Sequence, residues 1–471
     1  MNIEQIYTGC LAQGAYYIES NGEAAIIDPL REVQPYIDKA KADNANIKYI
    51  FETHFHADFV SGHVTLSNKT GASIVYGPNA ETLFDAIVAK DGQEFKLGDI
   101  TIVVLHTPGH TMESTTYLLR DENGEDHAIF SGDTLFLGDV GRPDLAQKAA
   151  AMTQEELAGI LYDSLRLKIM TLADNVIVYP AHGAGSACGK NLSKETVGTI
   201  GGQKQNNYAL RADMSKEEFV KEVTDGLLPP PQYFPLNVKM NKEGYEDVQE
   251  VIKRGTHAFS TEEFEVAANE TDALVLDVRH QSDFAKGHIP RSIFIGLDGS
   301  FAPWVGALVG DVKQNILIVA PEGREEETIT RLSRVGFDQT IGYLKGGFEA
   351  WKKSAREYDI VNSIPASQFK KVLDLEPNKI VFDVRKPGEY SAEHMKGAHS
   401  TPLDFINDHF SEFPDKDFFY VHCAGGYRSM IAASILKSRG IHNLVDIQGG
   451  YAAMKTLGIK TTDYSCPTKL N

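Results

Sequence analysis

The chain has 471 residues, of which 42% are hydrophobic and 24% charged, a composition typical of a globular protein. Its 65 acidic and 46 basic residues leave a net charge of −19, which argues against nucleic acid or an anionic membrane as a partner. No apolar run is long enough to span a bilayer, and the N-terminus lacks the pattern of a signal peptide. The four cysteines lie far apart, which favours reduced thiols in a cytoplasm, and the length favours about three domains.

The beginning of the chain is predicted to form strands and one helix, followed by a loop that carries metal-ligand residues. Strands are expected over 14–19, 24–27 and 47–51, and a helix over 33–42. The loop places His54, His56 and Asp58 at positions i, i+2 and i+4. Because neutral imidazole and carboxylate are the usual ligands of zinc and iron, this spacing indicates a metal site. The alternative is a polar loop whose histidines are solvated or hydrogen-bonded.

Three later strand-like runs are each followed by one more residue of a type that binds metals. The runs 101–105, 127–130 and 175–179 lead to His110, Asp133 and His182, respectively. Each transition contains glycine or proline, so each strand is expected to end there. This repetition of strand, turn and ligand favours a metal cleft at one sheet edge over a polar loop. Between these runs, residues 80–90 carry apolar side chains at helical spacing and are predicted to form a helix.

With all four motifs in order, residues 1–230 resemble the metallo-β-lactamase fold, an αββα sandwich, and within it the branch of glyoxalase II and persulfide dioxygenase. The stretch Gly141-Arg142-Pro143-Asp144 resembles the GRxD element of the dioxygenases. Arg142 either holds its loop through an ion pair, the interpretation we favour, or presents a cation to an anionic substrate. It is therefore a possible substrate-binding residue.

The resemblance to persulfide dioxygenases implies that one metal is held by His54, His110 and Asp133. Hydrolases of this fold commonly hold two metals and need a histidine directly after the aspartate of the loop, where this chain has Phe59. Two histidines and one carboxylate leave open positions, which Fe(II) uses to bind a persulfide and O2, whereas zinc more often keeps a closed shell. We therefore expect one Fe(II) per chain. Three further residues are expected to orient the ligands and handle protons: His56, Asp58 and His182.

Three of the four cysteines, Cys10, Cys188 and Cys466, carry weak functional signals. Cys188 lies in a glycine-rich loop six residues beyond His182, which could bring its thiol to the mouth of the cleft as a possible substrate-binding group. The alternative is a small buried side chain in a compact loop. Cys10 and Cys466 have no partner motif and are expected to be structural or incidental.

A domain boundary is predicted near residues 226–231. Three consecutive prolines there favour an extended, stiff connector over a core element. We therefore expect a linker over 231–254.

The rest of the chain contains an internal repeat of two similar units. Three motifs recur in the same order: Asp277-Val278-Arg279 as Asp383-Val384-Arg385, His288 as His394, and Gly346-Gly347 as Gly449-Gly450. Each unit alternates short β-rich runs with helical stretches, which indicates α/β architecture with a mainly parallel sheet. These motifs resemble the rhodanese fold. The predicted fold class is thus α/β multidomain, with a metallo-β-lactamase sandwich followed by rhodanese-like domains over 255–356 and 357–471.

In the last repeat, an apolar strand leads to Cys423, and a tight loop then leads to Arg428 at the start of a helix. The loop N–H groups, the helix N-terminus and Arg428 are suited to stabilise a thiolate or a persulfide, so Cys423 and Arg428 are expected to be catalytic. The alternative is a buried structural cysteine. The middle repeat has Pro321 at the place of the cysteine, and its glutamates oppose an anion site, which predicts a catalytically silent domain. The expected persulfide cradle consists of Ala424, Gly425, Gly426 and Tyr427.

The order of the three domains resembles that of bacterial persulfide dioxygenase–rhodanese fusions. This resemblance implies that the iron domain oxidises a low-molecular-weight thiol persulfide with O2 to sulfite and thiol. Cys423 would transfer sulfane sulfur, forming thiosulfate from sulfite or reversing that step, in sulfide detoxification. The alternatives are a zinc-dependent thioester hydrolase like glyoxalase II and a non-catalytic sulfane-sulfur carrier or sensor. We expect a cytoplasmic homo-oligomer with no nucleic-acid or membrane partner.

Overall fold

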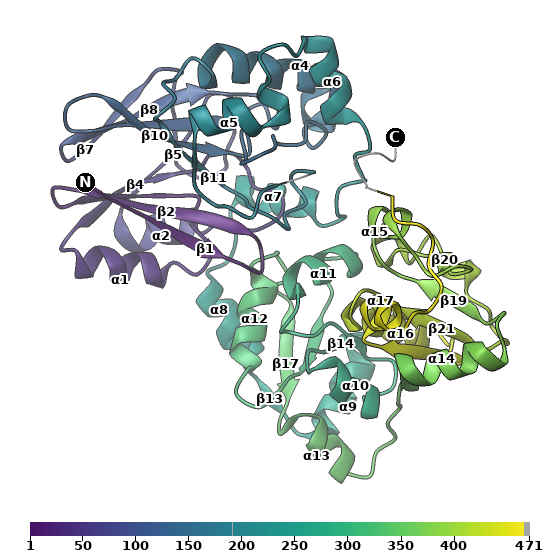
Figure 1. Cartoon of the computed structure of the whole chain (residues 1–471). Coiled ribbons are helices and arrows are strands. Elements are labelled where there is room, and N and C mark those ends of the chain that lie inside the picture. The colour runs from purple at the N-terminus through teal and green to yellow at the C-terminus, as the bar shows by residue number, and fades with distance from the viewer. Residues whose placement is uncertain (191, 466–471) are drawn as a thin grey trace. The chain divides into compact units, whose positions relative to one another are not determined.

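The computed structural model of the chain describes residues 1–190 and 192–465, so Cys466 lies outside the described residues. The chain divides into two compact units (Figure 1). Unit 1 comprises Met1–Val248 together with Leu332–Gly336, and unit 2 comprises Gln249–Arg331 and the chain from Phe337 onward.

Unit 1 is a sandwich of two six-stranded sheets with helices on its outer faces, which confirms the predicted αββα architecture. The first sheet, in spatial order, contains β1 (Asn2–Thr8), β2 (Gln13–Ser20), β3 (Glu23–Ile27), β4 (Asn46–Phe51), β5 (Ser73–Tyr76) and β6 (Ile87–Val88). The second contains β12 (Gly198–Thr199), β11 (Ile177–Pro180), β10 (Asp126–Gly132), β9 (Thr115–Arg120), β8 (Ile100–His106) and β7 (Glu94–Leu97).

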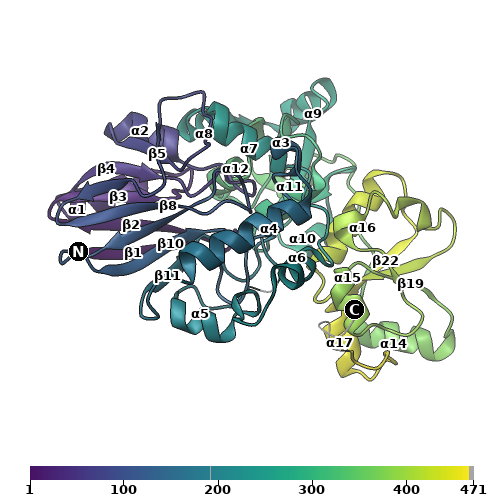
Figure 2. The ribbon, with the colours of Figure 1, turned by 90° about the horizontal axis from the view of Figure 1, so that it is seen from above.

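The helices of unit 1 cover both sheets. They are α1 (Gln34–Ala42), α2 (His63–Thr70), α3 (Gln147–Ala150), α4 (Gln154–Ser164), α5 (Ile200–Asn206), α6 (Lys216–Thr224) and α7 (Phe234–Glu243), with α8 (Val248–Gly255) beginning where the unit ends. Figure 2 shows α4 running across the second sheet, seen from above. Local sequence determines where two of these helices begin. Thr153 forms a capping box with Glu156 at the start of α4, and Ser215 forms one with Glu218 at the start of α6.

The core of unit 1 lies between the two sheets. Alternate residues of each strand point inward, and the largest of them are aromatic: Tyr16, Phe51, Phe95, Tyr117 and Phe130. Burying one such side chain contributes roughly 2–3 kcal/mol, so this layer fixes how the strands of the two sheets face each other. The loops at the carboxyl ends of these strands are thereby held in place.

Most sequence predictions for unit 1 are confirmed, since all six strand-like runs and the helix over 33–42 are present. The helix predicted over 80–90 is wrong. Ile87 and Val88 pair with β5 instead, and Leu83 is 77% exposed, so the apolar side chains at helical spacing do not form one buried face. The segment 231–254, expected to be a linker, contains α7 and most of α8, and α7 belongs to unit 1.

Unit 2 contains two five-stranded sheets, and every strand pair in both is parallel. The middle repeat orders them as β13 (Ala258–Phe259), β17 (Thr340–Leu344), β16 (Ile316–Val319), β14 (Leu274–Asp277) and β15 (Ile293–Phe294). The last repeat orders them as β18 (Ser363–Pro365), β22 (Leu444–Gln448), β21 (Phe419–His422), β19 (Ile380–Asp383) and β20 (His399–Ser400). The predicted α/β class with parallel sheets is confirmed.

Helices of similar length accompany each of these sheets. In the middle repeat they are α9 (Thr261–Glu270), α10 (Gln281–Lys286), α11 (Phe301–Leu308), α12 (Glu325–Ser333) and α13 (Gly347–Lys353). In the last repeat they are α14 (Ala366–Leu375), α15 (Pro387–Ala392), α16 (Tyr427–Ser438) and α17 (Gly450–Thr456).

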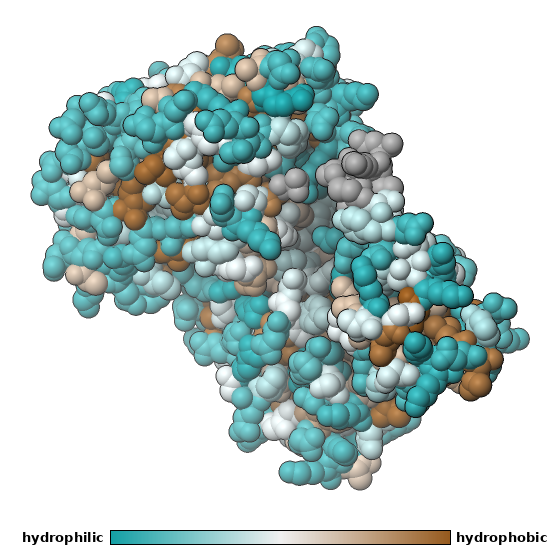
Figure 3. All heavy atoms as spheres, in the orientation of Figure 1, coloured by the Kyte–Doolittle hydropathy of each residue, from teal (hydrophilic) through white to brown (hydrophobic). Residues whose placement is uncertain are grey.

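The face shown in Figure 3 is mainly hydrophilic, in keeping with the net charge of −19. On the face shown, hydrophobic side chains of unit 1 gather over the region of β2 and β11. Among the described residues, no helix is both long enough and apolar enough to cross a membrane.

Candidate metal site and sulfur-transfer loop

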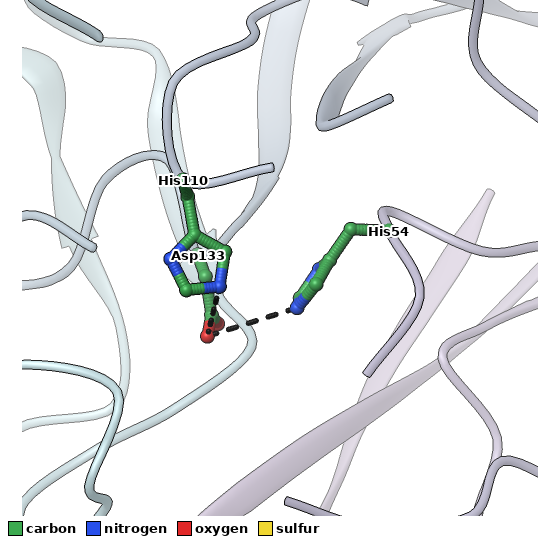
Figure 4. A group of neighbouring side chains, drawn as sticks. All are labelled: His54, His110 and Asp133. Carbon is green, nitrogen blue, oxygen red and sulfur yellow. Dashed lines mark ion pairs between the residues drawn. The ribbon is translucent and has the colours of Figure 1, made fainter. Parts of the chain in front are cut away.

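Three residues predicted to bind a metal come together at one edge of the sandwich (Figure 4). His54 follows β4, His110 follows β8 and Asp133 follows β10, so each leaves the carboxyl end of a strand. Asp133 Oδ2 lies 3.8 Å from His54 Nε2 and 3.5 Å from His110 Nε2, and all three side chains are buried. Their ligand-type atoms lie within 4.8 Å of one another, which is the convergence that a single ion requires.

The ring of His54 is oriented by its neighbours on the strand end. Thr53 Oγ1 donates a hydrogen bond to Asp28 Oδ2 at 2.8 Å, so its lone pair accepts from His54 Nδ1 at 3.0 Å. The backbone N–H of Thr53 also donates to Asp28 Oδ1 at 2.8 Å. Because Nδ1 carries the proton, Nε2 of His54 keeps a free lone pair that faces Asp133.

His110 is oriented in the same way by a backbone group. Its Nδ1 donates to the carbonyl oxygen of Arg142 at 2.8 Å, which leaves Nε2 as the acceptor nitrogen. Both histidines therefore present a metal-binding tautomer.

The electrostatics of the cluster also fit a cation. Burial, reinforced by His56, holds the pKa of His54 well below its usual value, so the ring is neutral. Burial alone would raise the pKa of Asp133, but His182 and the two other neighbouring histidines hold it far below its usual range. Asp133 Oδ2 is buried and has no hydrogen-bond partner among the described residues. A buried, ionised and unpartnered carboxylate oxygen facing two imidazoles matches the needs of a divalent metal.

His182 does not face the same point but bridges two carboxylates. Its Nδ1 lies 2.8 Å from Asp133 Oδ1 and its Nε2 lies 2.8 Å from Asp58 Oδ2. Burial alone would lower the pKa of His182, but the two carboxylates hold it well above its usual value. The bridge fixes the orientation of Asp133, in keeping with the expected role of Asp58 and His182 in orienting ligands.

Cys188 joins this bridge. Its sulfur and the ligand-type atoms of Asp58 and His182 lie within 4.8 Å of one another, and all three residues are buried. Burial, followed by Asp58 and Asp133, raises the pKa of the Cys188 thiol well above its usual value. Asp58 and His182, expected to orient the ligands, are thus joined by a third ligand-type residue.

His56 points away from the candidate metal ligands. Its Nε2 lies 3.1 Å from Asp28 Oδ1 and 3.6 Å from Glu52 Oε2, and it groups with these two residues and not with His54, His110 and Asp133. Burial, followed by Asp28, raises the pKa of Glu52 well above its usual value, so this carboxyl group holds a proton. Phe59 is fully buried, with its ring centroid 4.3 Å from that of His56.

Arg142 is buried and its guanidinium is engaged by the protein. It pairs with Asp144 through two contacts of 2.6 and 2.7 Å, and it donates to the carbonyl oxygens of Ala187 and Leu228 at 3.2 and 2.5 Å. Its own N–H donates to the carbonyl oxygen of Cys188 at 3.0 Å. These contacts fit the loop-holding interpretation, since Arg142 orients His110 and anchors the loop of Cys188.

Several residues that shape this site were not identified from the sequence. Asp28 and Thr53 stand at the ends of predicted strands, so their positions beside the ligand loop were the available signal. Glu52 directly follows the strand predicted over 47–51 and carries no signal of its own. Asn241 comes from α7, far along the chain, and its side-chain amide contacts the backbone of His56, Phe59 and Ser61. No sequence pattern connects it to that loop.

In unit 2, Cys423 follows β21 and begins the predicted cradle. Its sulfur accepts a hydrogen bond from the backbone N–H of Gly426 at 3.0 Å, and Gly426 adopts φ of 109°, a conformation that favours glycine. Cys423 is only 1% exposed, whereas Ala424 is half-buried and Gly425 is exposed. The sulfur of Cys423 is therefore shielded from solvent, while the loop that follows it reaches the surface.

The side chains at the end of the cradle and directly after it have structural partners. Arg428 donates to both carboxylate oxygens of Glu389, at 2.5 and 2.9 Å. The Tyr427 hydroxyl donates to the carbonyl oxygen of Gly296, in the middle repeat of the same unit, at 2.7 Å. Arg428 therefore lies beside the loop with its charge balanced by Glu389, while Tyr427 holds the loop from outside.

The register of the middle repeat corrects one expectation. Asp277 pairs with Val319 as Asp383 pairs with His422, so Ala320, not Pro321, occupies the position of Cys423. The predicted equivalence of Pro321 and Cys423 was off by one residue, because the loops, unlike the paired strands, differ between the repeats. No thiol occupies the position in either alignment.

The comparisons with known proteins agree with this architecture. The family model described as the metallo-β-lactamase superfamily matches residues 8–182, and that of the rhodanese-like domain matches 260–354 and 365–457.

Individual relatives divide between two activities. The human mitochondrial persulfide dioxygenase ETHE1 is 30% identical over 46% of this chain and 78% of its own. The cytoplasmic hydroxyacylglutathione hydrolase of Arabidopsis thaliana is 32% identical over 37% of this chain. The matched segment spans 65% of the length of that protein, which is less than two thirds. A crystal structure of a metallo-β-lactamase from Staphylococcus aureus subsp. aureus COL superimposes with a TM-score of 0.64 at 30% identity, covering 73% of this chain and 98% of that one.

Fold, site and matches together define a metallo-β-lactamase-fold protein with a candidate metal centre and two rhodanese-like domains. The chain belongs to the metallo-β-lactamase superfamily and is a metallo-β-lactamase–rhodanese fusion.

Proposed function

We propose that the chain oxidises a low-molecular-weight thiol persulfide with O2 at one Fe(II) held by His54, His110 and Asp133. The observation that carries this proposal is the composition of the cluster: two histidines and one carboxylate around a single point. Such a set leaves coordination positions open, as non-haem Fe(II) oxygenases require. The identity to the human persulfide dioxygenase supports the same choice.

The overall reaction combines one persulfide, one O2 and one water to give one thiol and sulfurous acid, which ionises to sulfite. When bound, Fe(II) would supply the redox chemistry that brings O2 and the persulfide together. The chain's own residues orient and protect this site. Thr53 and the Arg142 carbonyl fix the histidine tautomers, and His182 fixes Asp133 while holding a proton between two carboxylates.

Cys423 is proposed to carry sulfane sulfur in the same chain. Its thiolate attacks the outer sulfur of thiosulfate, forming a Cys423 persulfide and releasing sulfite, and the reverse step makes thiosulfate from sulfite. The N–H of Gly426 and the helix that starts at Tyr427 would stabilise the negative sulfur, and Arg428 lies beside it. Ala424, Gly425, Gly426 and Tyr427 form the cradle.

A second candidate function is hydrolysis of a thioester by two zinc ions. The observation that favours it is the second group, Asp58, His182 and Cys188, which offers three ligand-type atoms within 4.8 Å of one another. The identity to the Arabidopsis hydrolase points the same way. Phe59 stands against it, because it fills the position after Asp58 without offering a ligand.

One experiment separates the two functions. The metal-free full chain is reconstituted with Fe(II) or Zn(II), and each form is given glutathione persulfide in an oxygen electrode and S-lactoylglutathione in a thioester assay. The dioxygenase proposal predicts O2 uptake by the iron form alone and no thioester cleavage. Thioester cleavage by a form with two zinc ions, without O2 uptake by the iron form, would overturn it.

A further inference from the structure

Helix α7 buries a polar face against the candidate metal site. It lies outside residues 8–182, the part matched to the metallo-β-lactamase superfamily, and within the segment expected to be a linker. Its buried residues are Phe234, Asn237 and Asn241, at spacings of three and four that place them on one face. Two of the three are asparagines, which are rarely buried unless their amides are hydrogen-bonded.

The side-chain amide of Asn241 makes three hydrogen bonds, all with the backbone of residues 56–61. Its Nδ2 donates to the carbonyl oxygens of His56 and Phe59, at 2.8 and 2.9 Å. Its Oδ1 accepts from the backbone N–H of Ser61 at 2.9 Å. The side chain is 1% exposed, so water does not compete for these bonds. Two donors and one acceptor in this arrangement match an asparagine side chain and neither an aspartate nor a leucine.

The loop that Asn241 holds carries Asp58 at its centre. Asp58 lies between the two carbonyls bound by Asn241, and its own carbonyl accepts from the Tyr233 hydroxyl at 3.3 Å, just before α7 begins. Its carboxylate contacts His182, which in turn contacts Asp133. The loop position therefore sets the position of Asp58, and through His182 the direction in which Asp133 Oδ2 points.

We infer that Asn241 is a positioning residue of the metal centre, acting through the backbone of residues 56–61. This inference rests on the metal role proposed for His54, His110 and Asp133, and it extends the functional unit beyond residue 230 to α7. The polar contacts of the loop with Asn241 replace those that a loop in water would make, so removing them leaves buried backbone groups of residues 56–61 unpaired. The bonds of the Val60 N–H to the Arg334 carbonyl oxygen and of the Ser61 hydroxyl to the Pro29 carbonyl oxygen would remain, so the loop is expected to loosen around Asp58 and not to detach.

Asn237 provides a matched control on the same helix. It is fully buried one turn before Asn241, and neither atom of its amide has a hydrogen-bond partner among the described residues. Asn241→Ala and Asn237→Ala thus remove the same side-chain atoms from the same face of α7. Only the first removes contacts with the loop that carries Asp58.

The test measures metal binding by the full chain, not turnover. Co(II) is titrated into metal-free wild type, Asn241→Ala and Asn237→Ala, and the visible d–d spectrum is recorded with the dissociation constant. We expect Asn241→Ala to bind Co(II) 10–100-fold more weakly, with a changed spectrum, and Asn237→Ala to match wild type in both. Equal affinity and spectrum for wild type and Asn241→Ala, or equal losses in both variants, would overturn the inference. Failure of wild type itself to bind Co(II) would instead overturn the proposed metal site.

A second measurement covers the case in which Asn241→Ala folds poorly. Asn241→Asp keeps the size and the acceptor for Ser61 but turns an oxygen toward the carbonyls of His56 and Phe59. Hydrogen exchange of a peptide spanning residues 56–61 should be faster in Asn241→Asp than in wild type, while peptides from β8 and β10 stay protected. Unchanged exchange over 56–61 would contradict the positioning role.

Discussion

The two rhodanese-like repeats share a frame and differ most in the loop that follows their central strand. In each, the arginine of the Asp-Val-Arg motif pairs with the aspartate, through Arg279 and Asp277 or Arg385 and Asp383, with closest contacts of 2.6 Å in both. In each, that arginine lies over an aromatic ring of the following Gly-Gly helix: Phe348 at 4.3 Å and Tyr451 at 4.0 Å. His288 and His394 stack in the same way on Phe284 and Tyr390.

The loops that these frames hold have different chemistry. The last repeat presents Cys423 with the N–H of Gly426 on its sulfur, whereas the middle repeat presents Ala320 at the same register. Arg324, which follows the middle loop, is occupied by Asp298 and Glu327. The two repeats thus share the contacts that hold the rhodanese frame, and the proposed sulfur chemistry depends on a few residues of the loop in the last repeat.

Replacing the cysteine should have the largest effect. Cys423→Ser is expected to lower sulfur transfer from thiosulfate to cyanide by at least about 1000-fold, because the nucleophile is lost. O2 uptake with glutathione persulfide should be unchanged. The reciprocal variant, Ala320→Cys, should gain no transfer activity. A Cys423→Ser protein that retains both activities would show that Cys423 does not carry the sulfur.

The glycines behind the two loops give a matched pair for stability. A Cβ at Gly450 would lie 2.2 Å from the Cys423 carbonyl oxygen, whereas one at Gly347 would lie 3.0 Å from the Ala320 carbonyl oxygen. Both glycines have positive φ, of 53° and 59°, so backbone strain is similar. Gly450→Ala should cost about 3 kcal/mol or more of unfolding free energy and Gly347→Ala about 1–2 kcal/mol. Urea unfolding of the full chain measures both, and equal losses would contradict the tighter approach in the last repeat.

A buried carboxyl group distinguishes the last repeat at a third place. Burial raises the pKa of Asp446 to about 6, although Ser429 and Ser363 donate hydrogen bonds to it, and Tyr343 holds the same register in the middle repeat. Since the folded-state pKa exceeds the unfolded value of about 3.9, the folded state binds the proton more tightly. Stability should therefore fall as pH rises from about 4 to about 6 and stay lower above that range.

Asp446→Asn removes this titration. The variant is expected to lose the decline between pH 4 and 6 and to gain up to about 3 kcal/mol at pH 7 relative to wild type. Thermal unfolding midpoints measured across pH 4–8 provide the check. An unaltered pH profile would mean that Asp446 is not the group responsible.

The ion pair beside the cradle should give the smallest effect of the four. Arg428→Lys keeps the charge but loses the two-point contact with Glu389, and kcat/KM for thiosulfate is expected to fall about 10-fold. The conservative change Arg334→Lys, at an arginine of unit 1 paired with Glu32, serves as control and should leave sulfur transfer unchanged. A normal kcat/KM in Arg428→Lys would restrict Arg428 to a structural role.

Local patterns accounted for much of the fold and of the candidate site. Strand-like runs followed by ligand-type residues identified the candidate ligands, since a strand end fixes the position of the next side chain. The resemblance to persulfide dioxygenases then selected His54, His110 and Asp133 among them. Local sequence patterns did not identify site residues whose positions depend on packing between segments far apart in the chain. Cys188 joins Asp58 and His182 through the loop that Arg142 anchors, and Asn241 reaches the metal loop because α7 docks there. The segment 80–90 failed for the same reason, because pairing with β5 outweighs helical spacing.

The central claim is that one Fe(II), held on one side by two histidines and a carboxylate, uses O2 on a persulfide. The most direct measurement is the O2 consumed per glutathione persulfide by the full chain loaded with iron, together with its metal content. We predict one iron per chain and one O2 consumed per persulfide, with sulfite or thiosulfate as product. Two zinc ions per chain and no O2 consumption after iron loading would contradict the account.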